Sequence, residues 1–379
     1  MDENTIFHAY TILPLKVNLG GQVLATFIVY PSIETMNEGF LSQTSIQVVN
    51  EADKIVIFLC IQDNVLRHRA LLETENGNVE CLIKFIPARS ELYSRSKGLL
   101  ETSLLAEKTV GIVGLGSGGS PLAVELAKAG VGQFTLIDFD RLELSNISRH
   151  VCGINDLGRY KTYAVRDSIL QKNPYAKIST LEIDVNKARQ LCEDALAKVD
   201  IIMCASDNDR SRFFLNEISL KYKITAVFGR AITRAVGGDV LRVRPYNGPC
   251  YSCLYSQNIR PEGGDDEEIS QLDQAKELLP DYTSEADVKS AVQVGLSSDI
   301  TPISNFMVKL ALVELSRGAN SGIKSLEEDF ISDFYIWANR RENVYENWSK
   351  LEFNFNKPSI LRWYGAKVER DPKCMVCGQ

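Results

Sequence analysis

Apolar and polar positions follow a strand-like pattern in the first part of the chain. Residues 23–30 (VLATFIVY) and 54–62 (KIVIFLCIQ) are apolar runs rich in β-branched and aromatic residues. Asn76 and Gly77 stand between two further apolar segments, which is a strong hairpin signal. These features predict a smaller β-rich domain over residues 1–88.

From residue 109 onward, strand-like and helix-like segments alternate. Alternation of this kind predicts right-handed crossovers and a mostly parallel, doubly wound sheet with helices on both faces, an α/β fold. Strands are expected within residues 109–116, 133–140, 177–184, 199–207, 224–231 and 333–348, and helices within 120–132, 161–173 and 305–318. The acidic, weakly apolar residues 258–290 indicate a long solvated excursion from the sheet.

Length and charge narrow the class of protein. The 379 residues fit one large domain and one small domain. A net charge of −7 argues against a general nucleic-acid binder, which normally carries a basic face. No uncharged apolar stretch is long enough to span a membrane, and the N-terminal MDENTIFHAY has acids where a secretory signal needs cations. We therefore expect a cytoplasmic protein that binds neither nucleic acid nor membrane.

A glycine-rich segment, GLGSGGS at residues 114–120, follows an expected strand and opens an expected helix. Glycines let a backbone approach phosphate closely, and the start of a helix offers unpaired N–H groups to an anion. This context predicts a Rossmann-like nucleotide site. The segment lacks the G-K-[ST] of a Walker loop. The expected nucleotide contacts are Gly114, Gly116, Gly118 and Gly119.

Charged side chains gather after the glycine-rich segment, in DFDRLELSNISR (residues 138–149) and beyond. In an NAD site, Asp138 alone would suffice to hold the ribose, and the charged residues that follow it would have no role. Cations that neutralise phosphate and a carboxylate that holds Mg²⁺ suit a triphosphate better. Any one of these residues also suits a helix cap or a solvated surface, but the whole set does not. It comprises Asp138, Asp140, Asn146, Arg149, Lys161 and Asp207.

Four of the nine cysteines form two C-x-x-C pairs, Cys250/Cys253 and Cys374/Cys377. Two such pairs far apart in sequence predict a closed, tetrahedral and therefore structural zinc site, whereas a redox dithiol needs only one pair. The other five cysteines lie mostly among apolar residues and are expected to be small buried side chains. They are Cys60, Cys81, Cys152, Cys192 and Cys204.

Taken in series, these motifs resemble the ThiF/MoeB/HesA family and the adenylation domains of ubiquitin-activating enzymes. The resemblance begins at YSR (93–95) and continues through VGIVGLGSGGSPLAVELAKAGVG, LIDFDRLELSNISR, LGRYK and CASDN to the cysteine pairs. It implies that residues 89–379 are an adenylation domain. In that family, such a domain binds ATP·Mg²⁺ and transfers its adenylyl group to the C-terminal carboxylate of a β-grasp protein or peptide, which forms an acyl adenylate and releases pyrophosphate.

The resemblance also implies roles for individual residues. Asp138 resembles the ribose-binding acid, and Asp140, Asn146, Arg149 and Lys161 resemble the residues around the triphosphate. Asp207 resembles the Mg²⁺-linked acid beside the α-phosphate, and Asn208 completes the same nucleotide-binding motif. Arg95 matches an arginine that reaches into the other protomer's site, which implies a homodimer.

The sequence departs from thioester-forming relatives in one respect. No cysteine occurs between Leu254 and Lys373, so the expected enzyme stops at the adenylate and passes it to a separate nucleophile, such as a conjugating or sulfur-transfer partner. Weaker acceptor candidates are Cys152, Cys204 and the serines Ser297 and Ser298 of VGLSSDITP (294–302).

More than one function stays open at this point. Relatives of the microcin-adenylating type also lack that cysteine and modify a peptide. The chain is also compatible with a catalytically silent nucleotide-binding module and, ranked last, with an NAD(P) oxidoreductase. The N-terminal domain is interpreted either as a partner-binding module or as a structural or dimerising appendage.

Overall fold

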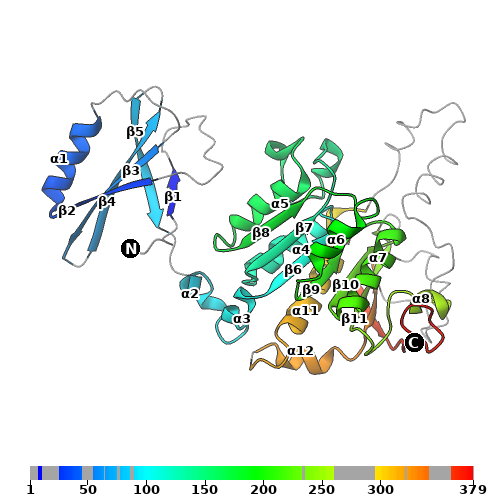
Figure 1. The fold of residues 1–379 in the computed structure, drawn as a ribbon. Coiled ribbons are helices and arrows are strands. Elements are labelled where there is room, and N and C mark those ends of the chain that lie inside the picture. The colour runs from blue at the N-terminus through cyan, green and yellow to red at the C-terminus, as the bar shows by residue number, and fades with distance from the viewer. Residues whose placement is uncertain are drawn as a thin grey trace, which may run out of the picture. The chain divides into compact units, whose positions relative to one another are not determined.

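The computed structural model describes residues 7–10, 25–44, 54–63, 65–74, 77–85, 89–232, 235–259, 295–320, 322–340 and 360–378. The chain divides into two compact units, Met1–Leu92 (unit 1) and Tyr93–Gln379 (unit 2) (Figure 1). Most of the predicted acidic excursion and residues 341–348 of the last expected strand region lie outside the described residues.

Unit 1 contains a five-stranded sheet of order β1-β5-β4-β3-β2. Strands β4 and β5 pair antiparallel up to Thr74 opposite Gly77, which confirms the predicted hairpin. Helix α1 was not predicted; its Met36 and Phe40 pack on Phe58 of the sheet. The elements are β1 (Phe7–Tyr10), β2 (Ala25–Tyr30), α1 (Ile33–Thr44), β3 (Lys54–Gln62), β4 (Val65–Thr74), β5 (Gly77–Phe85) and α2 (Arg89–Leu92).

Unit 2 is built on an eight-stranded sheet of order β13-β12-β11-β10-β9-β6-β7-β8. Strands β8, β7, β6, β9 and β10 run parallel, as the alternating pattern predicted. The residues of β6, β7 and β9 are buried from both sides, which is why these strands are nearly continuous apolar runs. The bounds are β6 (Thr109–Val113), β7 (Gln133–Ile137), β8 (Lys177–Leu181), β9 (Ile201–Cys204) and β10 (Thr225–Ala231).

The far end of this sheet is antiparallel, so the sheet is mixed. Strand β11 (Gly237–Val243) pairs antiparallel with β10 and with β12 (Phe334–Ala338), and β13 (Arg362–Ala366) pairs antiparallel with β12. The α/β class is confirmed. The prediction of a mostly parallel sheet holds for the half from β8 to β10 and misses β11 and β13.

Helices cover both faces of the sheet (Figure 1). Side chains of α6 and α7 pack on one face, and side chains of α4, α5 and α11 pack on the other. The bounds are η1 (Ser94–Ser96), α3 (Thr102–Ala106), α4 (Gly119–Lys128), α5 (Lys161–Leu170), α6 (Arg189–Leu196), α7 (Asp209–Tyr222), α8 (Cys253–Ser256), α11 (Ser297–Leu315) and α12 (Lys324–Asp329). No helix among the described residues is both long and apolar enough to cross a bilayer.

The strand order reverses beside β6. The chain passes from β6 to β7 and β8 on one side, then returns to place β9 and β10 on the other. Ligands of such sheets bind in the crevice outside the carboxyl ends of the strands at this switch point. The segments after β6, β7 and β9 therefore define the place to look for a site.

Candidate active site

The glycine-rich loop after β6 contains glycines of two kinds. Gly114 has φ +85°, and a Cβ there would lie 2.7 Å from the backbone oxygen of Ala205, so the close approach of β6 and β9 requires a glycine. A Cβ on Gly119 would lie 1.9 Å from the oxygen of Gly114. Gly116 has no atom within 4 Å of its Cβ position, and Gly118 has its nearest at 3.8 Å. Around Gly116, the described residues thus leave open space for a ligand.

Helix α4 starts directly at this loop. Gly118 is its N-cap, and no side chain of the described residues caps the first turn. The hydroxyl of Ser304, on α11, donates to the oxygen of Gly118 at 2.8 Å and fixes the loop from the other side. Uncapped N–H groups at a fixed helix start attract an anionic group such as phosphate.

Asp138, at the end of β7, ties this loop to the next one. Its Oδ2 accepts a hydrogen bond from the backbone N–H of Leu115 at 2.6 Å, and its Oδ1 accepts one from the backbone N–H of Asp140 at 2.8 Å. Burial raises the pKa of Asp138, although the charge of Lys161 and the two backbone donors oppose that shift. Each carboxylate oxygen keeps a lone pair that can accept a ribose hydroxyl.

Lys161, the first residue of α5, lies beside the same loop. Its Nζ donates to Oδ2 of Asp140 at 2.7 Å, and its backbone N–H donates to the oxygen of Asp140 at 3.0 Å. The lysine side chain is 10% exposed, and that of Asp140 is 46% exposed. A largely buried ammonium is thereby held at one place, with its carboxylate partner facing solvent.

Arg149 and Asn146 follow in the turn beyond β7. The amide oxygen of Asn146 accepts the backbone N–H of Glu143 at 3.0 Å, so this side chain also closes the short helix over Leu144–Asn146. Burial lowers the pKa of the half-buried Arg149. Within the part of the chain that the structure describes, no carboxylate pairs with its guanidinium. This cation is available to an external anion.

His150 is a site residue that was not predicted from the sequence. Its Nδ1 accepts the backbone N–H of Cys152 at 3.1 Å, so the proton must be on Nε2, which donates to the oxygen of Leu115 at 2.8 Å. Burial lowers the pKa of this imidazole, which keeps it neutral. The only local signal is its position directly after Arg149. The ring supports the glycine-rich loop.

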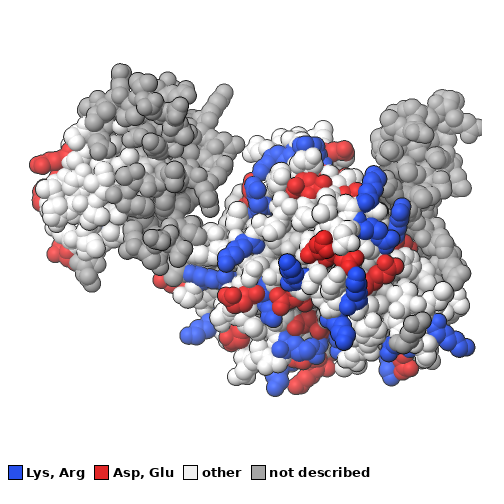
Figure 2. All heavy atoms as spheres, viewed as in Figure 1, with Lys and Arg blue, Asp and Glu red and all other residues white. Residues whose placement is uncertain are grey.

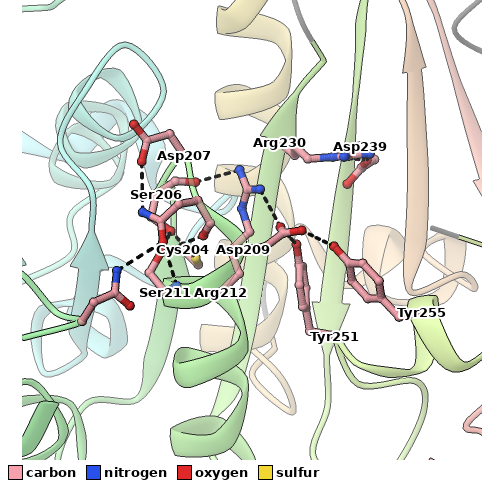
Figure 3. Close-up of polar contacts among 12 residues, drawn as sticks. Cys204, Ser206, Asp207, Asp209, Ser211, Arg212, Arg230, Asp239, Tyr251 and Tyr255 are labelled. Atoms are coloured by element: carbon pink, nitrogen blue, oxygen red, sulfur yellow. Dashed lines mark hydrogen bonds and ion pairs between the residues drawn. The ribbon is translucent and has the colours of Figure 1, made fainter. Parts of the chain in front are cut away.

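Asp207 and Asn208 connect β9 to α7. The carboxylate of Asp207 is exposed, and its hydrogen bond from the Asn208 amide is long, at 3.3 Å (Figure 3). Asn208 is the N-cap of α7, where its Oδ1 accepts the backbone N–H of Ser211 at 2.9 Å. The structure therefore gives Asn208 a capping role and leaves the Asp207 carboxylate accessible to a cation.

Arg95, the remaining predicted catalytic residue, lies on η1 at the surface of unit 2. Its guanidinium forms no ion pair with a carboxylate of the described residues. The contacts that build the glycine-rich loop do not include it. Its predicted action in a partner protomer's site stays a prediction.

The four cysteines of the two C-x-x-C pairs come together as their spacing indicated. All are buried, and their sulfur atoms lie within 4.8 Å of one another. The Sγ of Cys250 is 3.8 Å from those of Cys374 and Cys253, and the Sγ atoms of Cys253 and Cys377 are 3.4 Å apart. Sulfurs placed tetrahedrally ~2.3 Å from one zinc ion lie about 3.8 Å apart, so this cluster fits such an ion.

The weaker acceptor candidates differ in exposure. Cys152 and Cys204 are 4% and 0% exposed, and burial raises the pKa of both thiols, that of Cys152 to about 11. Neither thiol forms a thiolate readily at neutral pH. Ser297 and Ser298 are exposed at the start of α11.

Charges of both signs alternate over the visible face of unit 2, with Lys and Arg side chains among Asp and Glu (Figure 2). Many charges of unit 2 are paired locally, as in Arg159 with Asp156 and Asp167. Arg149 shares its lack of a carboxylate partner among the described residues with Arg95, and it is distinguished by its partial burial in the turn beyond β7 and not by a broad basic surface.

Comparison with known proteins places this site in a family. The ThiF family model matches residues 93–326, so the chain belongs to the ThiF family, as its motifs predicted. Two curated relatives are 30% identical: the Anopheles gambiae "adenylyltransferase and sulfurtransferase MOCS3" over 211 residues, and the Escherichia coli (strain K12) "sulfur carrier protein ThiS adenylyltransferase" over 160 residues.

Coverage of these relatives is partial. The first match covers 53% of this chain and 46% of the relative, and the second covers 42% and 62%. The chain thus spans about half the length of the curated relatives it matches. The solved structure of E. coli MccB with ATP shares the fold, with a TM-score of 0.53 and 16% identity over 78% of this chain and 77% of that one.

Proposed function

We propose that this protein is an adenylyltransferase that uses ATP to activate the C-terminal carboxylate of a ubiquitin-like β-grasp protein, with release of pyrophosphate. Residues 89–379 form the adenylation domain in this proposal. The observation that carries it is the convergence at the switch point of β6. Five features follow the strands that meet there. They are the open glycine loop, the Asp138 carboxylate, the Lys161–Asp140 pair, the Arg149 guanidinium and the accessible Asp207.

The chemistry needs charge placement and no general base. A carboxylate is already ionised at neutral pH. One of its oxygens forms a bond to the α-phosphorus of ATP, and the bond from that phosphorus to the oxygen bridging the β-phosphate breaks. Pyrophosphate leaves with the electron pair. Lys161, held by Asp140 before the reaction, and the half-buried Arg149 offset the repulsion between the two anionic reactants.

Asp207 is the residue proposed to hold Mg²⁺, with Asp140 as a second oxygen donor. Both carboxylates are exposed enough to accept a cation, and hard oxygen ligands are those that Mg²⁺ prefers. When bound with ATP, the ion neutralises phosphate charge. Glycine-loop N–H groups orient the phosphates, and Asp138 holds the ribose.

The four-cysteine cluster is proposed to hold a structural zinc ion. Cys374 and Cys377 lie near the end of the chain, so the ion fastens that segment to Cys250 and Cys253 after β11. All four thiols serve as ligands, which leaves no position for a substrate and makes the site structural.

Partners are part of the proposal. Arg95 acts from one protomer of a homodimer in the site of the other, and unit 1 binds a partner protein. With no cysteine between Leu254 and Lys373, the adenylate goes to a nucleophile on another protein, in conjugation or in sulfur transfer. The names of the curated relatives, a sulfur-carrier adenylyltransferase among them, support a β-grasp substrate.

Intact-mass spectrometry tests the proposal. The protein, ATP and Mg²⁺ are incubated with candidate β-grasp proteins and short peptides, each with a free C-terminus or with a C-terminal amide. An adenylyl adduct on a free-carboxylate β-grasp partner, and none on its amide, is the expected result. An adduct on peptides alone identifies a peptide-modifying enzyme instead. ATP binding with no adduct on any partner contradicts the proposal and leaves a silent nucleotide-binding module.

A further inference from the structure

Two tyrosines alternate with the cysteines in residues 250–255, here called the knuckle segment. The hydroxyl of Tyr251 donates to Oδ1 of Asp209 at 2.6 Å, and the hydroxyl of Tyr255 donates to Oδ2 of the same residue (Figure 3). Asp209 is the first residue of α7. The segment that carries Cys250 and Cys253 therefore holds both oxygens of a carboxylate at the start of a helix beside the proposed active site.

The contacts continue from Asp209 to the turn that carries Asp207. Nη1 of Arg212 donates to Oδ1 of Asp209 at 3.0 Å, and its Nη2 donates to the backbone oxygen of Ser206 at 2.8 Å (Figure 3). Ser206 directly precedes Asp207. An unbroken series of hydrogen bonds thus connects the knuckle segment to the residue before Asp207.

The hydrogen bonds of this series are strong because they are buried and each involves a charged group. The side chains of Arg212 and Asp209 are only 3% and 15% exposed. Burial opposes ionisation of Asp209, yet the hydroxyls of Tyr251 and Tyr255 and the charge of Arg212 outweigh it and hold its pKa below the usual range. Hydrogen bonds to an ionised, buried acceptor are stronger than neutral ones and costly to break.

Packing fixes the same segment along α7. The ring centroid of Tyr251 lies 5.2 Å from that of Phe213 and 5.0 Å from that of Phe228. Its backbone N–H donates to Oδ1 of the fully buried Asn216 at 2.9 Å. Any displacement of the knuckle segment is therefore transmitted to α7, and not absorbed by a loose contact.

We propose that Tyr251 and Tyr255 are positioning residues that couple the four-cysteine metal site to the Asp207 turn. Metal binding orders the knuckle segment, and the two tyrosines of this segment orient the Asp209 carboxylate. The guanidinium of Arg212, which contacts both Asp209 and the oxygen of Ser206, then fixes the turn that carries Asp207. The effect on catalysis rests on the proposed function, whereas the structural coupling does not. The metal site, far from Asp207 in sequence, thereby supports the active site as well as the C-terminal segment.

The test uses the full-length protein with its bound metal and removes single hydroxyls. Tyr255→Phe is the milder variant because Tyr255 is only partly buried, and Tyr251→Phe is the second. Tyr222→Phe is the matched control, because its hydroxyl bonds a carboxylate, Glu193, at 2.8 Å at the far end of the same helix. Metal content, hydrogen exchange of residues 205–214 and adenylation kinetics are measured for each.

The expected result is one bound metal ion in every variant, with faster hydrogen exchange over residues 205–214 in Tyr255→Phe and Tyr251→Phe but not in Tyr222→Phe. The two active-site-linked variants should also lose ~10-fold in kcat with little change in KM for ATP, the loss that follows from one charge-assisted hydrogen bond. A purely structural role would lower the amount of folded protein without this split.

Unchanged exchange over residues 205–214 in both variants, with metal retained, overturns the coupling. Faster exchange with an unchanged kcat overturns the positioning role of the two tyrosines. A wild-type protein that adenylates no partner contradicts the proposed function instead, and the exchange measurements still decide the coupling. The two failures are therefore distinguishable.

Discussion

Replacing Lys161 with methionine removes an ammonium from the centre of the proposed site while keeping a side chain of similar length. In the wild-type protein, Nζ of Lys161 lies 2.7 Å from Oδ2 of Asp140. The change leaves that carboxylate without its partner and removes one of the cations proposed to face the triphosphate. Its effects on folding and on catalysis differ in size.

The folding effect is small because Asp140 is 46% exposed and can be solvated by water when the lysine is gone. An ion pair with one exposed partner contributes at most ~1 kcal/mol to stability. Loss of a preorganised group that stabilises transition-state charge typically costs ~10²–10³ in kcat, or ~3–4 kcal/mol. We expect Lys161→Met to fold normally and to lose at least ~100-fold in adenylation rate.

Two assays on the same preparations separate these effects: urea unfolding for stability and partner-dependent ATP–pyrophosphate exchange for activity. Lys108→Met is the matched control, because Lys108 pairs with Asp200 at 3.0 Å beside the opposite, amino end of β6. The control should keep full activity. An exchange rate in Lys161→Met within about threefold of the wild type would refute the role of this lysine in transition-state stabilisation.

Further predictions concern the partner protomer, the glycine loop and the histidine. Arg95→Ala and Asp207→Ala should each be inactive, while their mixture should regain part of the exchange activity; hybrid dimers that form without activity would exclude action in trans. Gly116→Ala should weaken ATP binding in calorimetry at unchanged stability, whereas Gly114→Ala should lower the free energy of unfolding, because its φ is +85° and its Cβ would lie 2.7 Å from a backbone oxygen. Equal stability losses in the two glycine variants would count against the open space at Gly116. The lowered pKa of His150 means that its contribution to stability is present above about pH 6.5 and is lost as pH falls through the folded-state pKa. His150→Gln should therefore lose less stability than the wild type between about pH 7 and pH 5 in urea titrations, and identical profiles would contradict the assignment.

Local motifs allowed the candidate site residues to be proposed from the sequence, and their roles stay predictions. The glycine loop, the acids after β7 and the cysteine pairs each occupy a few adjacent positions, and their spacing carries their chemistry. The parallel strands were predicted for a similar reason, because burial on both faces produces unbroken apolar runs.

The antiparallel end of the sheet could not be predicted in this way. Strand β11 begins with two glycines and includes Asp239 and Arg242, residues that a local pattern assigns to the surface. Both are 1% exposed, and their burial is offset by Arg230 on the neighbouring strand for Asp239 and by the distant Asp333 and Glu314 for Arg242. Such compensation becomes visible only when the chain is folded.

Two parts of the site were missed for the same reason. The contacts of His150 with Leu115 and of Tyr255 with Asp209 join residues 35 and 46 positions apart. Apart from the position of His150 directly after Arg149, neither residue carries a local signal of function. Asn208, assigned by motif to the nucleotide, caps α7 in the structure, and its contact with the nucleotide stays a prediction.

The central claim is that the charges at the switch point catalyse transfer of an adenylyl group to a carboxylate. ATP–pyrophosphate exchange with Mg²⁺, measured against a panel of β-grasp proteins and their C-terminal amides, tests it most directly. We expect exchange that requires a free C-terminal carboxylate and that disappears in Asp207→Ala. Tight ATP binding without exchange for any partner, or undiminished exchange in Asp207→Ala, would contradict it.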